Sequence, residues 1–300
     1  MLILNRTAGY VITAISGGLG NQMFQYAAGR RLALVNSAEL LLYPGDRYRR
    51  GSYRAYRLDC FGIGGRLATE AEAGGLRRVS RTRRRLAKPF PCLASREDRE
   101  VVRETSHLFD PAILSLQGNV KLRGYWQCER YFADIADTIR ADFRLRQALS
   151  ARDREVLARI QSGPCAFIHV RRGDYVTHPV DKIKFGTCSP EYYRGAVALL
   201  RQQVGPELLF FVFSDDASWV REMRIGGEGA QIVDWNGDSP QRDLALMREC
   251  THAVIANSSF SWWGAWLGDG RERMVIAPRV WFQGRPNDHD IVPERWLKLG

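Results

Sequence analysis

The chain has 300 residues, of which 45% are hydrophobic and 26% are charged. This composition is ordinary for a globular protein and excludes a disordered chain. The 44 lysines and arginines outnumber the 33 aspartates and glutamates, so the formal net charge is +11. The excess lies in two stretches that contain no acidic residue, Arg47–Arg57 and Arg77–Lys88. Because the rest of the chain is nearly neutral, the charge does not indicate a histone-like nucleic-acid binder.

The start of the chain predicts neither a signal peptide nor a membrane anchor. Arg6 interrupts the first apolar residues, and no window reaches the roughly 18 apolar residues that a membrane-spanning helix needs. We therefore expect a soluble, cytoplasmic protein. The 6 cysteines are scattered without a C-x-x-C pair, so we expect free thiols rather than disulfides or a zinc site. Two of them, Cys165 and Cys250, adjoin apolar stretches and are predicted to be buried.

The first half of the chain opens with the pattern of a strand, a glycine-rich turn, a helix and a strand. Its first apolar run is typical of a buried parallel strand. Residues 44–104 are rich in Arg and Gly and show no clean periodicity. The predicted elements of this half are strands over Tyr10–Ser16, Glu39–Tyr43 and Val120–Trp126, a helix from Met23 to about Val35, and a helical segment over Tyr131–Gln161.

The second half alternates strands and helices more regularly, which predicts a parallel, doubly wound sheet. Ser189 and Ser239 are each followed by proline, a pattern typical of helix starts. The Ser162–Pro164 turn predicts a boundary between domains 1–161 and 162–300. The predicted strands are Cys165–Val170, Leu208–Phe213, Gln231–Trp235, Ala253–Ala256 and Met274–Ala277.

Two adjacent arginines, Arg171 and Arg172, follow the first strand of this sheet. They stand at its carboxyl end, where open α/β sheets bind their ligands. Arginine forks match phosphate oxygens bidentately, and Asp174 is placed to orient one of them. A pair of solvated surface charges is the plainer interpretation, but the position after a buried strand favours an anion site.

Two adjacent carboxylates, Asp215 and Asp216, follow the next strand. No third ligand stands at a useful spacing for a metal, and the 5 histidines show no metal-binding pattern. The carboxylates could instead accept hydrogen bonds from a base edge or a ribose. Helix capping by Ser214 or Asp215 explains the residues equally well, so both interpretations stay open.

A dense polar cluster follows the strand over Ala253–Ala256. Its hydroxyls and backbone N–H groups stand at a predicted helix start, which is a natural seat for phosphate. Capping alone needs only one such side chain. The three tryptophans that follow, Trp262, Trp263 and Trp266, are expected to pack in the core. The four polar residues are Asn257, Ser258, Ser259 and Ser261, and Phe260 lies among them.

The turn Gly17–Gln22 matches neither the dinucleotide-binding pattern nor a P-loop. Glycines such as Gly18 allow a backbone to approach a ligand closely, and Asn21 and Gln22 would then offer amide contacts. His169 lies on a predicted strand, and its plainer interpretation is a satisfied core histidine.

Together these stretches resemble the α-1,2-fucosyltransferases of bacteria and animals, glycosyltransferase family 11. The matching stretches are Gly17–Gly29, His169–Val176, Phe213–Asp216 and Asn257–Trp266, in the family's order over nearly the whole chain. The second, an H-x-R-R-x-D pattern, is shared with α-1,6- and protein O-fucosyltransferases, whereas the first and last indicate the α-1,2 branch. The resemblance implies an α/β fold of GT-B architecture, with two Rossmann-like domains facing across a cleft.

The resemblance also implies roles for individual residues. The first domain would hold much of the acceptor and the second would bind GDP-fucose, with Arg171 on its β-phosphate and Arg172 and Asp174 supporting that loop. Asp215 or Asp216 would meet the nucleotide. Members of the family need no metal, so no cofactor is expected, and the missing membrane anchor fits a bacterial enzyme. The residues from Asn257 to Ser261 would line the diphosphate or nucleotide pocket.

The implied reaction is inverting transfer of L-fucose from GDP-β-L-fucose to the 2-hydroxyl of a terminal galactoside. The acceptor would be a galactose-ended oligosaccharide or a lipid-linked glycan, as in O-antigen or surface polysaccharide synthesis. Asp174, His169 and Asp181 are candidates for a general base. The alternatives are a fucosyltransferase of another linkage, and a nucleic-acid-binding or scaffold protein that uses its arginine clusters but leaves the strand-end motifs unexplained.

The arginine clusters have two interpretations of their own. The plainer one is a solvated face. The sharper one is peripheral attachment to anionic lipid at the inner membrane face, with no binding of nucleic acid.

Overall fold

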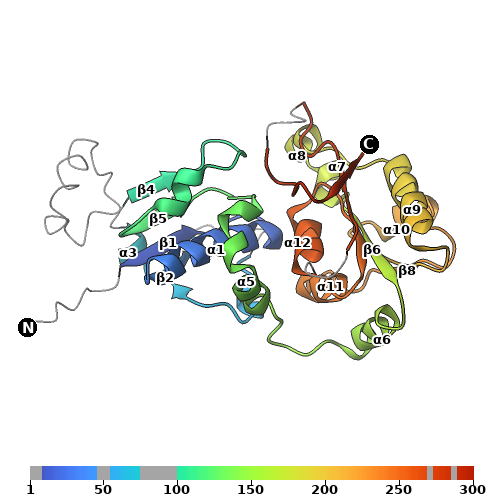
Figure 1. Cartoon of the computed structure of the whole chain (residues 1–300), viewed down its shortest axis with the longest axis horizontal. Helices are drawn as coiled ribbons and strands as arrows, with labels where there is room; N and C mark the ends of the chain where they lie inside the picture. The colour runs from blue at the N-terminus through green and yellow to red at the C-terminus, as the bar shows by residue number, and fades with distance from the viewer. Residues whose placement is uncertain (1–8, 46–54, 75–99, 269–272, 285–288) are drawn as a thin grey trace, which may run out of the picture. The chain divides into compact units, whose positions relative to one another are not determined.

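Figure 1 shows the computed structural model of the chain, which describes residues 9–45, 55–74, 100–268, 273–284 and 289–300. The Arg77–Lys88 cluster and most of Arg47–Arg57 lie outside the described residues. The chain divides into two compact units, Met1–Phe143 and Arg144–Gly300. Each unit is built on one parallel sheet flanked by helices, which confirms the predicted α/β fold class. Within the described residues, no helix is both long and apolar enough to cross a bilayer.

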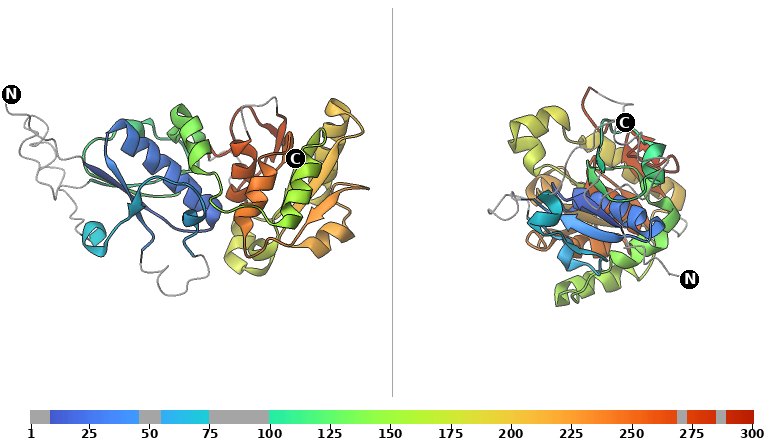
Figure 2. Two further views of the ribbon diagram at one scale, coloured as in Figure 1. Left: turned by 90° about the horizontal axis from the view of Figure 1, so that it is seen from below. Right: turned by 90° about the vertical axis from the view of Figure 1, so that its left-hand side faces the viewer.

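The sheet of the first unit has the strand order β3-β2-β1-β5-β4 over the described residues. Its central strand β1 pairs in parallel with β2 and with β5. Helix α1 packs along this sheet (Figure 2), and a Cβ on its Gly29 would lie 3.0 Å from the Cβ of Thr13 on β1. The described elements are β1 (Tyr10–Ala14), α1 (Leu19–Val35), β2 (Glu39–Tyr43), η1 (Leu58–Cys60), β3 (Arg66–Leu67), α3 (Glu70–Gly74), β4 (Glu100–Arg103), η3 (Pro111–Ser115), β5 (Val120–Arg123), η4 (Glu129–Tyr131), η5 (Ala133–Ile135) and α5 (Ala136–Asp142).

The sheet of the second unit has the order β11-β10-β9-β6-β7-β8 over the described residues, again with parallel pairing. Its central strand β6 is buried along its whole length, as expected for a sheet covered on both faces. The described elements are α6 (Ala151–Ile160), β6 (Cys165–Val170), α7 (Gly173–Thr177), α8 (Pro179–Lys184), α9 (Pro190–Val204), β7 (Leu209–Ser214), α10 (Ala217–Glu222), β8 (Gln231–Val233), α11 (Pro240–Met247), β9 (His252–Val254), α12 (Ser259–Leu267), β10 (Val275–Pro278) and β11 (Leu297–Leu299).

The two faces of the second sheet carry different helices. Figure 1 shows α9 and α10 on one side of it and α11 and α12 on the other. Because side chains alternate along a strand, Ile168 packs with α9 in one core cluster, whereas His169 lies against Phe260 of α12, with 5.4 Å between ring centroids. The tryptophans of α12 are at most 1% exposed, which confirms that they belong to the core. Cys165 and Cys250 are buried free thiols, as predicted.

The helical prediction for Tyr131–Gln161 is only partly right, because α5 ends at Asp142 and α6 begins at Ala151. Ser150 starts a new helix through a capping box. Its hydroxyl accepts from the Asp153 N–H at 3.1 Å, and the Asp153 carboxylate accepts from the Ser150 N–H at 3.2 Å. The S-x-x-D signal for this start is present in the sequence.

Buried Asp153 also ties α6 to the second unit. It accepts hydrogen bonds from the Trp235 indole at 3.0 Å and from the Asn236 amide at 2.9 Å. These bonds agree with the division into compact units, which falls after Phe143 and places α6 in the second unit.

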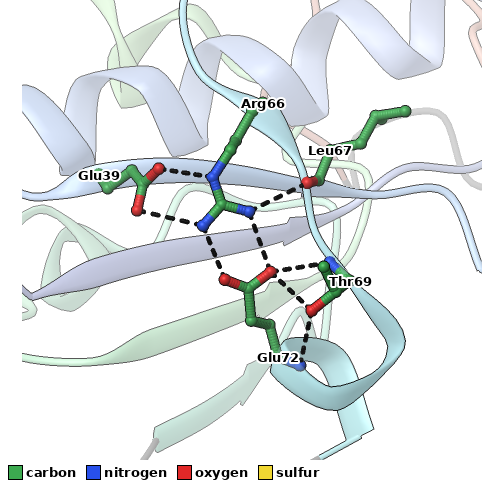
Figure 3. A network of polar contacts seen from close by, with 5 residues as sticks. All are labelled: Glu39, Arg66, Leu67, Thr69 and Glu72. Atoms are coloured by element: carbon green, nitrogen blue, oxygen red, sulfur yellow. Dashed lines mark hydrogen bonds and ion pairs between the residues drawn. The ribbon is translucent and has the colours of Figure 1, made fainter.

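The short edge strand β3 of the first unit is fastened by one arginine (Figure 3). Arg66 pairs with Glu39 of β2 and with Glu72 of α3, each at 2.7 Å. The hydrogen bond from Arg66, and then those from Thr69, lower the pKa of Glu72 to about 2. Glu39 begins β2, so this exposed network lies at the amino end of the sheet, away from the carboxyl ends of the strands.

The contacts of Asp153 predict its contribution to stability. We expect Asp153→Ala to lower the free energy of unfolding by about 2–4 kcal/mol, because the buried Asn236 amide and the half-buried Trp235 indole lose their acceptor and the capping box of α6 loses one of its two hydrogen bonds. Urea unfolding followed by tryptophan fluorescence measures this change. Glu155→Gln, an exposed carboxylate on the same helix, is the matched control. A loss below about 0.5 kcal/mol for Asp153→Ala, the scale of ordinary surface changes, would contradict the assignment.

Candidate functional site

The second sheet has a topological switch point between β6 and β9. From β6 the chain continues outward through β7 and β8, and it then returns to β9 on the other side of β6. Ligands of open α/β sheets bind beyond the carboxyl ends of the strands at such a point. The residues that follow β6 and β9 are the Arg171 loop and the polar cluster that begins α12. The switch point is therefore the candidate site of this unit.

Arg171 is held between two carboxylates that come from different strand ends. Its guanidinium donates to Asp174 at 2.6 Å and pairs with Asp215, which follows β7, at 2.7 Å. Burial alone would lower the pKa of Arg171, but these carboxylates outweigh burial and raise it. The guanidinium carbon also lies 5.6 Å from the ring centroid of Tyr175, within cation–π range. The arginine is thus charged and fixed in place.

Arg172 also contacts the two carboxylates that follow β7. Its backbone N–H donates to Asp215 at 2.8 Å, and its side chain donates to Asp216 at 2.9 Å. The hydrogen bond from Arg172 lowers the pKa of Asp216. Asp216 also accepts from the Trp219 N–H at 3.1 Å and so caps α10. The cap of α10 is therefore Asp216, and not Ser214 or Asp215 as the sequence suggested, and both carboxylates also orient the two arginines.

Gly173 allows the arginine loop and the β7 end to approach each other. A Cβ at this position would lie 2.6 Å from an Asp215 carboxylate oxygen. Any larger residue would push Asp215 away from Arg171. The glycine of the H-x-R-R-G-D stretch is thus needed for the ion pair itself.

Asn257 holds several loops around the site together. Its side-chain amide donates to the carbonyls of Phe185 at 2.9 Å and of Trp281 at 3.2 Å. Its backbone carbonyl accepts from the Tyr175 hydroxyl at 3.2 Å. Asn257 is 2% exposed, so the amide predicted to line the nucleotide pocket is engaged with the backbone of the protein.

The serines at the start of α12 divide into buried and accessible ones. Ser258 caps the helix by accepting from the Phe260 N–H at 3.3 Å. Ser261 is fully buried and donates to the Ser258 carbonyl at 3.2 Å. Ser259 and Phe260 are partly exposed. The accessible part of the predicted phosphate seat is therefore the first turn of the helix.

His169 lies beneath this turn, 6% exposed. Its Nδ1 is buried and has no hydrogen-bond partner among the described residues. Burial, together with the positive charge of Arg171, lowers the pKa of His169 to about 3. The imidazole is therefore neutral at physiological pH and is a weak base.

The other two candidates for a general base, Asp174 and Asp181, are each paired with a neighbouring side chain. Asp174 is buried and paired with Arg171, and Asp181 lies 3.4 Å from the imidazole of His178.

No group of His, Cys, Asp and Glu residues in the described ranges has the arrangement of a metal site.

The structure adds Tyr175 to the candidate residues. It stacks on Phe185 with 4.8 Å between ring centroids, and it connects Arg171 to the backbone of Asn257. The signal was present in the sequence, because Tyr175 directly follows Asp174 within the His169–Val176 stretch.

The glycine-rich turn of the first unit has a largely structural role. The buried Gln22 amide donates to the carbonyls of Gly17 and Ala55, at 3.0 and 2.9 Å. Asn21 is partly exposed and accepts from Gln127 at 2.8 Å. Apart from its two chain neighbours, no described residue has an atom within 4 Å of a Cβ built on Gly18. Gln22 thus fastens the turn, and Asn21 and Gly18 stay accessible.

The chain has two α/β units, each with one parallel sheet, as in the GT-B fold of glycosyltransferases. Solved structures share the fold. Fucosyltransferase NodZ from Bradyrhizobium has a TM-score of 0.50 at 14% identity, covering 86% of this chain and 92% of its own. A mutant of Arabidopsis thaliana FUT1 in complex with GDP has a TM-score of 0.51 at 15% identity, covering 95% of this chain and 75% of its own.

Sequence relatives identify the family. The family model Glycosyl transferase family 11 matches residues 105–299. The chain is 31% identical to an Escherichia coli α-1,2-colitosyltransferase over 96% of its length and 98% of that protein. It is 27% identical to galactoside α-(1,2)-fucosyltransferase 1 of Saimiri boliviensis boliviensis, over 85% of this chain and 64% of that protein. The chain therefore belongs to glycosyl transferase family 11 and is a glycosyltransferase.

The environment of His169 predicts a pH dependence of stability. The folded protein keeps this histidine neutral down to about pH 3, whereas an unfolded histidine takes up a proton near pH 6.5. Stability from the neutral imidazole is therefore complete above pH 6.5 and is lost as the pH falls. Between pH 6.5 and 4 the wild type should lose up to about 1.4 kcal/mol per pH unit more than His169→Gln. Parallel pH profiles of urea unfolding for the two proteins would contradict the buried, neutral state.

Proposed function

We propose that the chain is an inverting α-1,2-fucosyltransferase that moves L-fucose from GDP-β-L-fucose to the 2-hydroxyl of a terminal galactoside. The observation that carries the proposal is that Arg171 and the first turn of α12 follow the neighbouring strands β6 and β9 at the switch point of the second sheet, where Tyr175 links the arginine to Asn257. The names of the relatives support the linkage, since both the bacterial colitosyltransferase and the animal enzyme are α-1,2 transferases.

The chemistry of the leaving group agrees with this site. Cleavage of the sugar–phosphate bond places negative charge on the departing diphosphate, while the sugar becomes oxocarbenium-like. A guanidinium has five N–H donors in a fixed fork. Asp174 and Asp215 orient Arg171 and leave further donors for phosphate oxygens. The N-terminus of α12 adds backbone N–H groups and the positive end of a helix dipole. Fixed donors of this kind stabilise developing charge without a metal.

The contacts of the candidate bases shape the rest of the mechanism. Asp174 is paired with Arg171, and His169 is a weak base. In the proposed mechanism Asp174 positions Arg171, and the main catalytic contribution is stabilisation of the diphosphate. The acceptor hydroxyl then needs little help from a base, because an oxocarbenium-like sugar is a strong electrophile.

A bacterial polysaccharide is the proposed setting for the reaction. The chain is 29% identical to the Escherichia coli O-antigen biosynthesis glycosyltransferase WbnK, over 96% of this chain and 99% of that protein. We therefore place the proposed acceptor, a galactose-ended glycan that is free or lipid-linked, in O-antigen or related surface polysaccharide synthesis.

Transfer of colitose is the second candidate, favoured by the similarity to the colitosyltransferase. Colitose is fucose without its 3-hydroxyl. A site that hydrogen-bonds this hydroxyl would reject the colitose donor by several orders of magnitude, whereas a site without that contact would accept both donors. Competition between the two nucleotide sugars for one acceptor therefore distinguishes the candidates.

The phosphate role of Arg171 gives the most direct test of the proposal. Arg171→Ala should lower kcat for transfer from GDP-fucose to lactose by about 10²-fold or more, because a preorganised donor to the leaving group is lost. Arg171→Lys keeps the charge beside Asp174 and hence the fold, but it loses the planar fork and should also be strongly impaired. Transfer is measured by release of GDP and by the linkage of the product.

Arg194→Ala is the matched control, because Arg194 is exposed on α9 and pairs only with Glu191 in the contacts described for it. It should transfer fucose at the wild-type rate. Near wild-type transfer by both Arg171 variants would remove the phosphate role.

A further inference from the structure

The first sheet also has a topological switch point, which lies between β1 and β5. The chain continues from β1 outward through β2 and β3, and it then forms β4 at the opposite edge and β5 between β4 and β1. Thr13, near the end of β1, pairs in register with Leu122 of β5. The turns that leave these strands, Gly17–Asn21 and Gly124–Gln127, therefore stand side by side at the carboxyl edge of the sheet. Such an edge is where open α/β sheets bind ligands.

The Gly124–Gln127 turn has an unusual backbone. Trp126 has a φ of 57°, in the left-handed region that bulky residues rarely occupy. Its side chain is 1% exposed, and its indole N–H is buried without an acceptor among the described residues. Strained backbone of this kind persists only where neighbouring groups enforce it, and it is concentrated at functional sites.

Glu104, directly after β4, is the group that enforces this conformation. One of its carboxylate oxygens accepts from the Tyr125 N–H at 2.7 Å, and the other accepts from the Trp126 N–H at 2.9 Å. The carboxylate lies so close to the turn that a Cβ on Gly124 would be 2.4 Å from the Cβ of Glu104. Burial raises the pKa of Glu104, and the two backbone N–H groups oppose that effect.

Gln25 of α1 fixes the same turn to the end of β1. Its fully buried amide donates to the Gly124 carbonyl at 3.1 Å and accepts from the Ser16 N–H at 2.7 Å. The turn is thus held by a carboxylate on one side and by an amide on the other. The Gln25 side chain is fully buried and Glu104 is only partly exposed, so both groups stabilise the turn from inside the protein.

The clamped turns present polar and aromatic groups together. The Gln127 amide donates to the Asn21 carbonyl oxygen at 2.8 Å. This bond leaves the NH₂ of Asn21 and the carbonyl oxygen of Gln127, one donor and one acceptor, without another partner among the described residues. Tyr125 is partly exposed beside them. Neighbouring donors and acceptors suit the vicinal hydroxyls of a sugar, and an aromatic ring suits its apolar face.

We infer that Asn21, Tyr125 and Gln127 bind the acceptor sugar, and that Glu104 is the positioning residue that holds their turn in the binding conformation. This inference rests on the proposed function, since the ligand is taken to be the galactoside that receives fucose. It assigns to the first unit a neutral, hydroxyl-rich ligand, in contrast to the anionic ligand proposed for the second unit.

The experiment compares variants by separate titrations of lactose and GDP-fucose. Gln127→Ala should raise the KM for lactose about tenfold or more while the KM for GDP-fucose stays within about twofold. Of the two substrates, only lactose would lose a hydrogen-bond partner. Glu104→Gln should have the same pattern, since an amide can accept from only one of the two backbone N–H groups. Asp137→Asn, a fully exposed carboxylate on α5, is the matched control and should leave both constants unchanged.

Folding of each variant is checked by urea unfolding, because the substitutions lie in the first unit, and its affinity for GDP, proposed to bind the second unit, should be that of the wild type. Active variants whose KM for lactose is unchanged would overturn the inference, as would an effect confined to the KM for GDP-fucose. Absence of transfer by the wild type to lactose and to every other galactose-ended acceptor tested would instead overturn the proposed function. Saturation-transfer NMR of lactose with the GDP-bound wild type and Gln127→Ala then tests the sugar site without turnover, and equal signals would overturn it.

Discussion

The guanidinium of Arg171 lies between Asp174 and Asp215, and this pair of contacts organises the second unit around its site. The two carboxylates come from separate loops, one after β6 and one after β7. Gly173 permits their approach, and Tyr175 connects the arginine to the β9–α12 turn. The charge also acts on the core, because Arg171 helps to keep the buried His169 neutral. A change at any of these residues would therefore disturb the proposed diphosphate site.

The same principle operates in the first unit with uncharged groups. Gln22 and Gln25 stand three residues apart on α1, so both point from one face of the helix. Gln22 fastens the turn after β1 to the backbone near Ala55, and Gln25 fastens it to the turn after β5. Each amide serves a donor and an acceptor role at once, which apolar side chains of the same size cannot do. Gln22 and Gln25 of the glycine-rich stretch thus hold the neighbouring loops together.

The sequence predicted which residues gather at the carboxyl ends of the strands better than it predicted the contacts that they make. Parallel strands end at one edge of a sheet, so polar groups directly after β6, β7 and β9 had to gather there. The role of Asn257 depends on carbonyls of Phe185 and Trp281 that approach only in the folded chain, and residue type alone does not show this. Glu104 is similar, because its partners at Tyr125 and Trp126 lie about twenty positions away. No spacing rule connects such residues.

Errors in the predicted elements have local causes. Alternation of apolar and charged residues suggested one helical segment over Tyr131–Gln161, but buried Phe143 ends α5 and the capping box at Ser150 begins α6. Helical periodicity in the sequence does not reveal a break between two helices when the residues between them are themselves compatible with a helix. The S-x-x-D signal at Ser150 would have shown the break.

The central claim is that Arg171 and the first turn of α12 form the seat of the donor diphosphate. A crystal structure of the chain with GDP bound tests it most directly. The claim predicts a phosphate oxygen within about 3 Å of the Arg171 guanidinium and another near the backbone N–H groups that begin α12, with Asp174 still paired to the arginine. GDP bound elsewhere, with the contacts of Arg171 to Asp174 and Asp215 unchanged and no phosphate near them, would contradict it.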